Sequence, residues 1–192
     1  MRRRQIATAL LLLSLQLPAA AQQETHPDAE LRQRVREAVL AADSFTDRFD
    51  AEVWLLDMST RLAGMRLKRL AADQHAELLR LVHREATRTD LDPSIVLSVI
   101  EVESRFDRFA ISEAGARGLM QIMPFWLDEI GEPDANLFTP RTNLRIGTTI
   151  LRYYLDRERG NLRRALARYN GSLGSDRYPN LVFGALNRRW EP

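Results

Sequence analysis

The carboxylate of Glu103 stands at the end of an apolar helical stretch and before a glycine-rich turn, in the segment ESRFDRFAISEAGARGLMQIMP. The apolar residues before and after it share a helical spacing: Ile95, Val99, Val102 and Phe106. At about 100° per residue, Glu103 falls about 40° from Val99, at the edge of this stripe. Glu101 falls about 200° from Val99 by the same rule. The pattern predicts that Glu103 faces packed apolar surface and that Glu101 faces water.

A carboxyl group removed from water favours its neutral form, so its pKa rises. Glu103 would then be a suitable proton donor near neutral pH. Periodicity alone favours a simpler role, in which Glu103 caps the helix or pairs with Arg105 or Arg108. The turn that follows favours chemistry, because its small residues would let the backbone approach a ligand closely. These small residues are Ser112, Gly115, Ala116 and Gly118.

The residues after the turn suit the surface of a sugar. Met120 and Met123 offer adaptable apolar surface, and the Gln121 amide can both donate and accept hydrogen bonds. Each methionine alone is more typical of a core than of a site. Together with Glu103, the three residues predict a groove with one acid and an apolar, hydrogen-bonding wall.

Three blocks in this order resemble the soluble lytic transglycosylase (SLT) family, whose catalytic domain belongs to the lysozyme-like superfamily. Residues 103–106 resemble the family's catalytic E-S motif, and residues 115–124 resemble its G-x-x-G-L-M-Q-I-M-P block. Residues 168–172, RYNGS, resemble its A-Y-N-A-G block. The third block departs from the family at every position except the Tyr-Asn pair, which leaves the turn after that pair open. The resemblance extends from about Asp90 to Trp190.

The resemblance implies that Glu103 is the single catalytic residue, acting first as general acid and then as general base. It also implies substrate-binding roles for six residues: Ser112, Met120, Gln121, Met123, Tyr169 and Asn170. Tyr169 would hydrogen-bond or orient Glu103, and Asn170 would support the same corner. Residues 143–151, NLRIGTTIL, resemble the family's N-x-x-x-G helix, which packs behind the site.

The implied reaction is cleavage of the β-1,4 bond between N-acetylmuramic acid and N-acetylglucosamine in peptidoglycan, which leaves a 1,6-anhydro end. One carboxylate suffices there, because the muramyl C6 hydroxyl is a nucleophile within the substrate itself. A hydrolytic, lysozyme-like muramidase is the nearest alternative, and it would need a second acid across the sugar. Asp107 is close in sequence, but sequence does not place it. The other alternative is a catalytically silent wall-binding or assembly protein.

Other function classes find little support. The three histidines, His26, His75 and His83, lack the spacing of metal ligands, and there is no cysteine. The segment His83-Arg84-Glu85 lacks the second histidine of H-E-x-x-H. We therefore expect no metal and no cofactor. Without the three arginines at residues 2–4, the chain has 28 − 3 = 25 basic and 26 acidic side chains, which does not favour a nucleic-acid partner.

The first 21 residues have the form of a cleaved secretory signal peptide. A positive segment, Arg2 to Arg4, precedes the apolar stretch Ile6 to Leu17, and Ala19 to Ala21 form an A-x-A site. The apolar stretch is shorter than the roughly 20 residues of a membrane span. We expect cleavage near Ala21, no stable membrane insertion afterwards, and a periplasmic protein.

Nearly every later segment has helical periodicity, and sustained two-residue alternation is missing, so we expect an all-α fold. The predicted helices cover residues 28–42, 51–62, 74–89, 95–104, 140–159, 161–169 and 179–190. The first three carry no motif and would form an N-terminal helical arm, residues 22–89, that is a candidate contact for an envelope complex. Residues 90–192 would form the catalytic domain, which by resemblance is of the goose-type lysozyme-like class, with peptidoglycan glycan strands as its partner.

Overall fold

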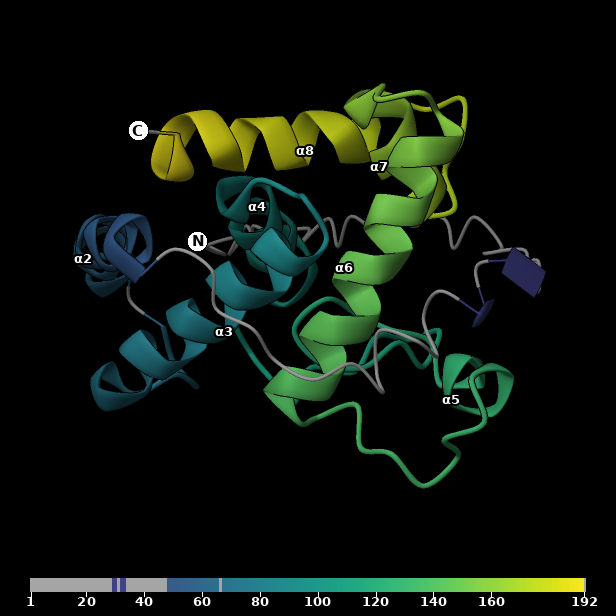
Figure 1. Ribbon diagram of the computed structural model, residues 1–192, viewed down its shortest axis with the longest axis horizontal. Helices are drawn as coiled ribbons and strands as arrows, with labels where there is room; N and C mark the ends of the chain where they lie inside the picture. The colour runs from purple at the N-terminus through teal and green to yellow at the C-terminus, as the bar shows by residue number, and fades with distance from the viewer. Residues whose placement is uncertain (1–28, 31, 34–47, 66, 192) are drawn as a thin grey trace, which may run out of the picture.

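The computed structural model describes residues 29–30, 32–33, 48–65 and 67–191 (Figure 1). Over these residues the chain is helical, and strand-like pairing is limited to two isolated bridges, Ile111 with Arg117 and Arg117 with Ile122. The predicted all-α class is therefore confirmed for the described part of the chain. The predicted signal peptide, residues 34–42 of the first predicted helix and His26 lie outside the described residues.

The helices follow the order of the prediction and lie close to its boundaries. They are α2 (Arg48–Ala63), η1 (Ala72–Gln74), α3 (His75–Arg88), α4 (Pro93–Ser104), α5 (Phe125–Glu129), α6 (Pro140–Arg157), α7 (Leu162–Tyr169), α8 (Arg177–Ala185) and η2 (Leu186–Trp190). The predicted last helix is divided, because η2 is one stretch of π-helix. Helix α5 was not predicted, since five residues are too few to show a helical period.

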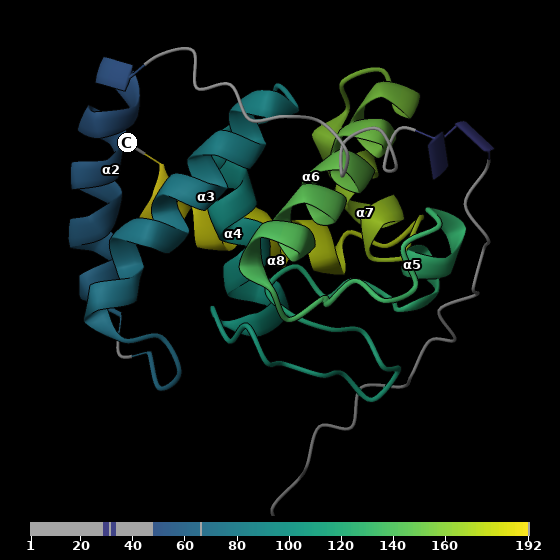
Figure 2. The same cartoon turned by 60° about the horizontal axis from the view of Figure 1, so that its bottom comes forward.

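Helix α4 lies at the centre of the molecule, with α3, α8 and η2 packed against it (Figure 1 and Figure 2). Asp92 caps its first turn by accepting a hydrogen bond from the Ser94 amide, and Pro93 takes the first helical position. Every residue from Ser94 to Ile100 is buried. The helix is thus enclosed on all sides rather than along one stripe.

The far side of α4 is covered by the end of the chain, which corrects the prediction for Glu101. The Glu101 carboxylate accepts hydrogen bonds from the Trp190 indole, at 2.8 Å, and from the Arg189 guanidinium, at 3.3 Å. Its side chain is only 15% exposed. The prediction that Glu101 faces water is wrong, because α8 and η2 pack on the side of α4 that helical periodicity assigned to water.

A buried ion pair joins α3 to α6. The Glu85 side chain is fully buried, and its two carboxylate oxygens accept hydrogen bonds from Arg145 at 3.0 and 3.2 Å. Arg88 also donates to Glu85, at 2.8 Å. These contacts hold α3 within the packed body of the molecule, although the sequence placed this helix in the N-terminal arm.

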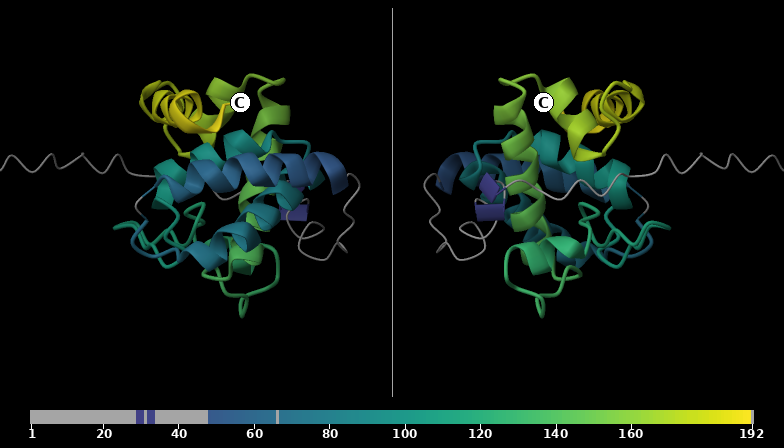
Figure 3. Two further views of the ribbon diagram at one scale, coloured as in Figure 1. Left: turned by 90° about the vertical axis from the view of Figure 1, so that its left-hand side faces the viewer. Right: turned by 90° about the vertical axis from the view of Figure 1, so that its right-hand side faces the viewer.

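The long loops between α4 and α6 lie at the opposite end of the molecule from α8 (Figure 1 and Figure 3). The turn after α4 begins with two residues at positive φ, Arg105 at 51° and Phe106 at 65°. Left-handed backbone at two successive residues reverses the chain sharply. Glu103 therefore lies in the last turn of a buried helix, beside the loop that carries the second sequence block.

Candidate active site

Glu103 lines a cleft of about 290 Å³ together with five of the six residues predicted to bind substrate. These five are Ser112, Gln121, Met123, Tyr169 and Asn170. The cleft also receives four residues that the sequence did not single out for sugar contact: Ala116, Ile122, Trp126 and Ile150. The end of α4, the following loop, α5, α6 and the end of α7 thus converge on one hollow.

The Glu103 carboxyl group has one hydrogen-bond partner among the described residues, the Tyr178 hydroxyl, which donates to it at 2.7 Å. Removal from water raises the pKa of Glu103 from its ordinary value of 4.5 to about 7, and the hydrogen bond from Tyr178 opposes part of that rise. Near neutral pH, Glu103 is therefore present both as acid and as carboxylate. This is the behaviour of a group that donates and later accepts a proton.

Tyr178 takes the place that the resemblance gave to Tyr169. The Tyr169 hydroxyl instead donates to the Met120 carbonyl oxygen, at 2.8 Å. Burial and the negative charge of Glu103 raise the pKa of both tyrosines well above the usual value, so both keep their protons. Tyr169 therefore ties the third sequence block to the second, and Tyr178 is the residue that contacts the acid.

Met120 is the one predicted substrate-binding residue that does not line the cleft. Its side chain is fully buried, and a Cβ atom on Gly147 would lie 2.5 Å from its sulfur atom. Only glycine at residue 147 leaves room for Met120 against α6. The side chain thus fixes the loop to the helix behind it, and the cleft receives Gln121 and Met123 instead.

Asn143 holds the loop from behind, as the resemblance implied for residues 143–151. Its amide oxygen accepts from the Met120 amide at 2.8 Å, and its amide nitrogen donates to the carbonyl oxygens of Arg117 and Leu137 at 2.8 and 2.9 Å. A Cβ atom on Gly118 would lie 2.4 Å from this nitrogen, and the φ of Gly118 is +77°. The close approach that Gly118 permits is therefore to Asn143 and not to a ligand.

The loop uses part of the hydrogen-bonding capacity of the predicted site residues. The Gln121 amide nitrogen donates to the carbonyl oxygens of Gly118 and Ala110, at 2.9 and 3.3 Å. The Ser112 hydroxyl accepts from the Ala116 amide at 3.0 Å. These bonds fix the side chains that line the cleft before any substrate arrives, which lowers the ordering cost of binding.

Replacing Tyr178 with Phe should raise the pKa of Glu103 above 7 by about one unit, because a hydrogen bond that favours the carboxylate is lost. The pKa can be measured by ¹³C NMR titration of the labelled glutamate side chain. Tyr153→Phe is the matched control, because it makes the same chemical change at a tyrosine whose hydroxyl contacts Arg157 on α6 and not Glu103. An unchanged or lower Glu103 midpoint in Tyr178→Phe would contradict the assigned contact.

Residues 80–183 match the family described as Transglycosylase SLT domain. A protein named membrane-bound lytic murein transglycosylase C from Actinobacillus pleuropneumoniae is 38% identical over 84 residues, which cover 39% of this chain and 23% of that relative. The protein of the same name from Yersinia pestis is 30% identical over 113 residues, covering 50% and 32%. The chain thus spans less than a third of the length of these relatives.

An X-ray structure of an inactive mutant of the lytic transglycosylase Slt from Pseudomonas aeruginosa aligns with a TM-score of 0.46 and 22% identity. The alignment covers 84% of this chain and 34% of that chain. The family match begins within α3, ten residues before the catalytic domain predicted from sequence. Because that match takes in more than half of its residues, the chain belongs to the transglycosylase SLT domain family.

Proposed function

We propose that this protein is a peptidoglycan lytic transglycosylase that cleaves the β-1,4 bond between N-acetylmuramic acid and N-acetylglucosamine and leaves a 1,6-anhydromuramoyl end. The observation that carries the proposal is Glu103, a carboxyl group with a pKa of about 7 in a preformed cleft. Family membership supports the same reaction class. No other acidic side chain is found among the described residues that line the cleft.

In the proposed reaction, neutral Glu103 protonates the glycosidic oxygen as the bond to the anomeric carbon breaks and positive charge develops on the muramyl ring. The Glu103 carboxylate then accepts the proton of the muramyl C6 hydroxyl, whose oxygen bonds to the anomeric carbon. Water is not consumed. Tyr178 stabilises the carboxylate between the two steps, because its hydroxyl donates to that group.

The surroundings of Asp107 make the hydrolytic alternative less suitable. A retaining or inverting glycosidase generally places a second carboxyl group across the sugar from the acid. Asp107, the nearest candidate, pairs with Arg69 at 3.3 Å and accepts a hydrogen bond from the Phe109 amide at 2.9 Å. It does not belong to the described lining of the cleft.

We further propose that the protein acts in the periplasm after removal of residues 1–21, with glycan strands as its partner. Within the described residues, no helix combines the length and the apolar character needed to cross a membrane. The proposed organisation keeps an N-terminal segment, residues 22–89, before the catalytic domain at residues 90–192. The N-terminal segment, residues 22–89, remains the candidate contact for an envelope complex.

Mass analysis of products from purified sacculi tests the reaction. Soluble fragments should carry anhydro ends that are about 18 Da lighter than hydrated ends, because the internal hydroxyl replaces water. Hydrated ends alone would identify a muramidase instead. Binding to sacculi without release of any fragment would identify a silent wall-binding protein.

A further inference from the structure

A second cavity, of about 470 Å³, lies on the other side of the loop that follows Glu103. It is enclosed by η1, α3, that loop and the first turn of α6. Its apolar wall consists of Leu70, Leu78, Leu81, Phe106, Leu119 and Pro140. The volume is in the range of small-molecule and peptide sites, which extend from about 300 to 1,000 Å³.

The polar lining of this cavity is strongly cationic. Four arginines reach it, Arg80, Arg84, Arg108 and Arg141, against one acidic residue, Glu77. Arg80 and Arg108 are exposed at its rim. Arginine presents a planar set of donors that matches a carboxylate. The cavity therefore combines an apolar floor with two exposed arginines that can pair with carboxylates and one exposed glutamate that can pair with an ammonium group.

The positive charge extends into the wall of the cavity. The Glu85 carboxylate is shared by three guanidinium groups, those of Arg84 at 3.7 Å, Arg88 at 2.8 Å and Arg145 at 3.0 Å. Arg84 is thus engaged with Glu85, and the exposed Arg80 and Arg108 are the cations that a ligand at the rim would meet. An anionic ligand is attracted to such a rim.

The cavity and the catalytic cleft share the loop between α4 and α5 as a wall. Leu119 lines the cavity, whereas Gln121, two residues later, lines the cleft. Glu103 lines the cleft, and Phe106 and Arg108 line the cavity soon after it in the chain. A ligand in the cavity would therefore contact the same loop that shapes the catalytic groove.

We propose that this cavity binds the peptide side chain of peptidoglycan, the short stem peptide that branches from the muramyl sugar; this inference rests on the proposed function. A stem peptide built of alanine, glutamate and a diamino acid carries several carboxylates and one free ammonium group. Its carboxylates pair with Arg80 and Arg108, and its ammonium group pairs with Glu77. Its alanine methyl groups and the methylene chain of the diamino acid pack on the leucine wall.

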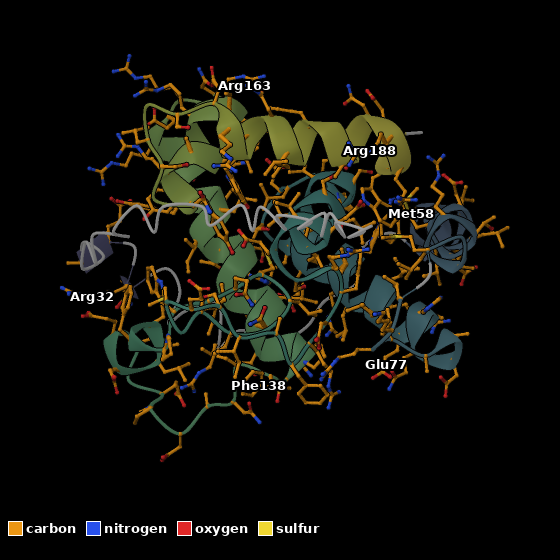
Figure 4. The ribbon with its side chains drawn as sticks, turned by 180° about the vertical axis from the view of Figure 1, so that it is seen from behind. Arg32, Met58, Glu77, Phe138, Arg163 and Arg188 are labelled. Atoms are coloured by element: carbon orange, nitrogen blue, oxygen red, sulfur yellow. The ribbon has the colours of Figure 1, made fainter. Side chains whose placement is uncertain are left out.

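The test measures binding of the tetrapeptide L-Ala-γ-D-Glu-diaminopimelate-D-Ala, acetylated at its L-Ala nitrogen to mimic the amide link to the muramyl sugar, by isothermal titration calorimetry. The Glu103→Gln protein is used throughout. Arg80→Gln and Arg108→Gln should each weaken binding about tenfold, because each removes one charge-assisted pair. Arg188→Gln is the matched control, since this exposed arginine lies near the end of the chain, away from Glu77 (Figure 4). It should bind the peptide as tightly as its parent.

Three results would overturn the proposal: no measurable binding, equal binding by the Arg80 and Arg108 variants and their parent, or equal binding of a glutamate-rich peptide of unrelated sequence. A second arm compares cleavage of sacculi with cleavage of glycan strands stripped of peptide by an amidase, using proteins with intact Glu103. Arg80→Gln and Arg108→Gln should lower the ratio of the two rates, and an unchanged ratio counts against the proposal. Because the binding arm needs no cleavage, its result is independent of whether the anhydro product forms.

Discussion

Glu103→Gln should lower the rate of fragment release from sacculi by at least about a thousandfold, since the amide can neither donate a proton to the leaving oxygen nor accept one from the nucleophile. The side chain keeps nearly the same shape, so the cleft should keep its form and its binding. Release is measured as soluble anhydro-ended fragments per enzyme. Cleavage at the parental rate would refute the assignment of the acid.

Comparing the free energy of unfolding of Glu103→Gln with that of its parent shows whether the variant loses its chemistry or its fold. The pKa of Glu103 is raised from 4.5 to about 7 in the folded protein. Between these values the folded state holds a proton that the unfolded chain has lost, so the parent loses stability as pH rises through this window. The loss has an upper bound of about 3 kcal/mol. Glu103→Gln does not titrate, so between pH 5 and pH 8 it should gain stability relative to the parent in urea denaturation.

Glu85→Gln should destabilise the fold by about 3 kcal/mol or more, because it removes a fully buried carboxylate that pairs with the buried guanidinium of Arg145. The Arg145 side chain is only 5% exposed, and both oxygens of Glu85 accept its hydrogen bonds. For a chain of this length the melting temperature should fall by about 10 °C. Thermal and urea denaturation followed by circular dichroism provide the measurement.

Glu77→Gln is the matched control for this experiment, because it makes the same chemical change at an exposed residue of the same helix. Its effect should stay within about 0.5 kcal/mol. Equal stability of Glu85→Gln and Glu77→Gln would show that α3 is not held by the ion pair. The expected difference would mean that the proposed catalytic domain depends on α3, a helix that the sequence placed outside it.

Much of the framework could be predicted because local signals are strong. The Asp92-Pro93 cap, the spacing of apolar residues in α3 and α4, and Gly160 after α6 all depend on neighbouring residues only. The resemblance also located Glu103 and five of the residues that line the cleft with it. The order and spacing of the blocks were sufficient there, because they resemble those of the family.

The errors share one physical cause, which is contact between residues far apart in the sequence. Helical periodicity described α4 as if one side faced water, whereas Trp190 and Arg189 reach Glu101 on that side. The hydrogen bond from Tyr178 to Glu103 joins residues 75 positions apart. The clearance of Gly147 for Met120 likewise depends on tertiary packing. No spacing rule within one helix contains this information.

The contacts that α8 and η2 make with α4 have a consequence for when the proposed activity appears. Ribosomes make Glu103 before Tyr178 and Trp190, and until these later residues dock, one side of the helix that carries Glu103 is open to water. A hydrated glutamate ionises at low pH and is a poor proton donor in a neutral compartment. A partly synthesised or partly translocated chain should therefore lack the proposed activity.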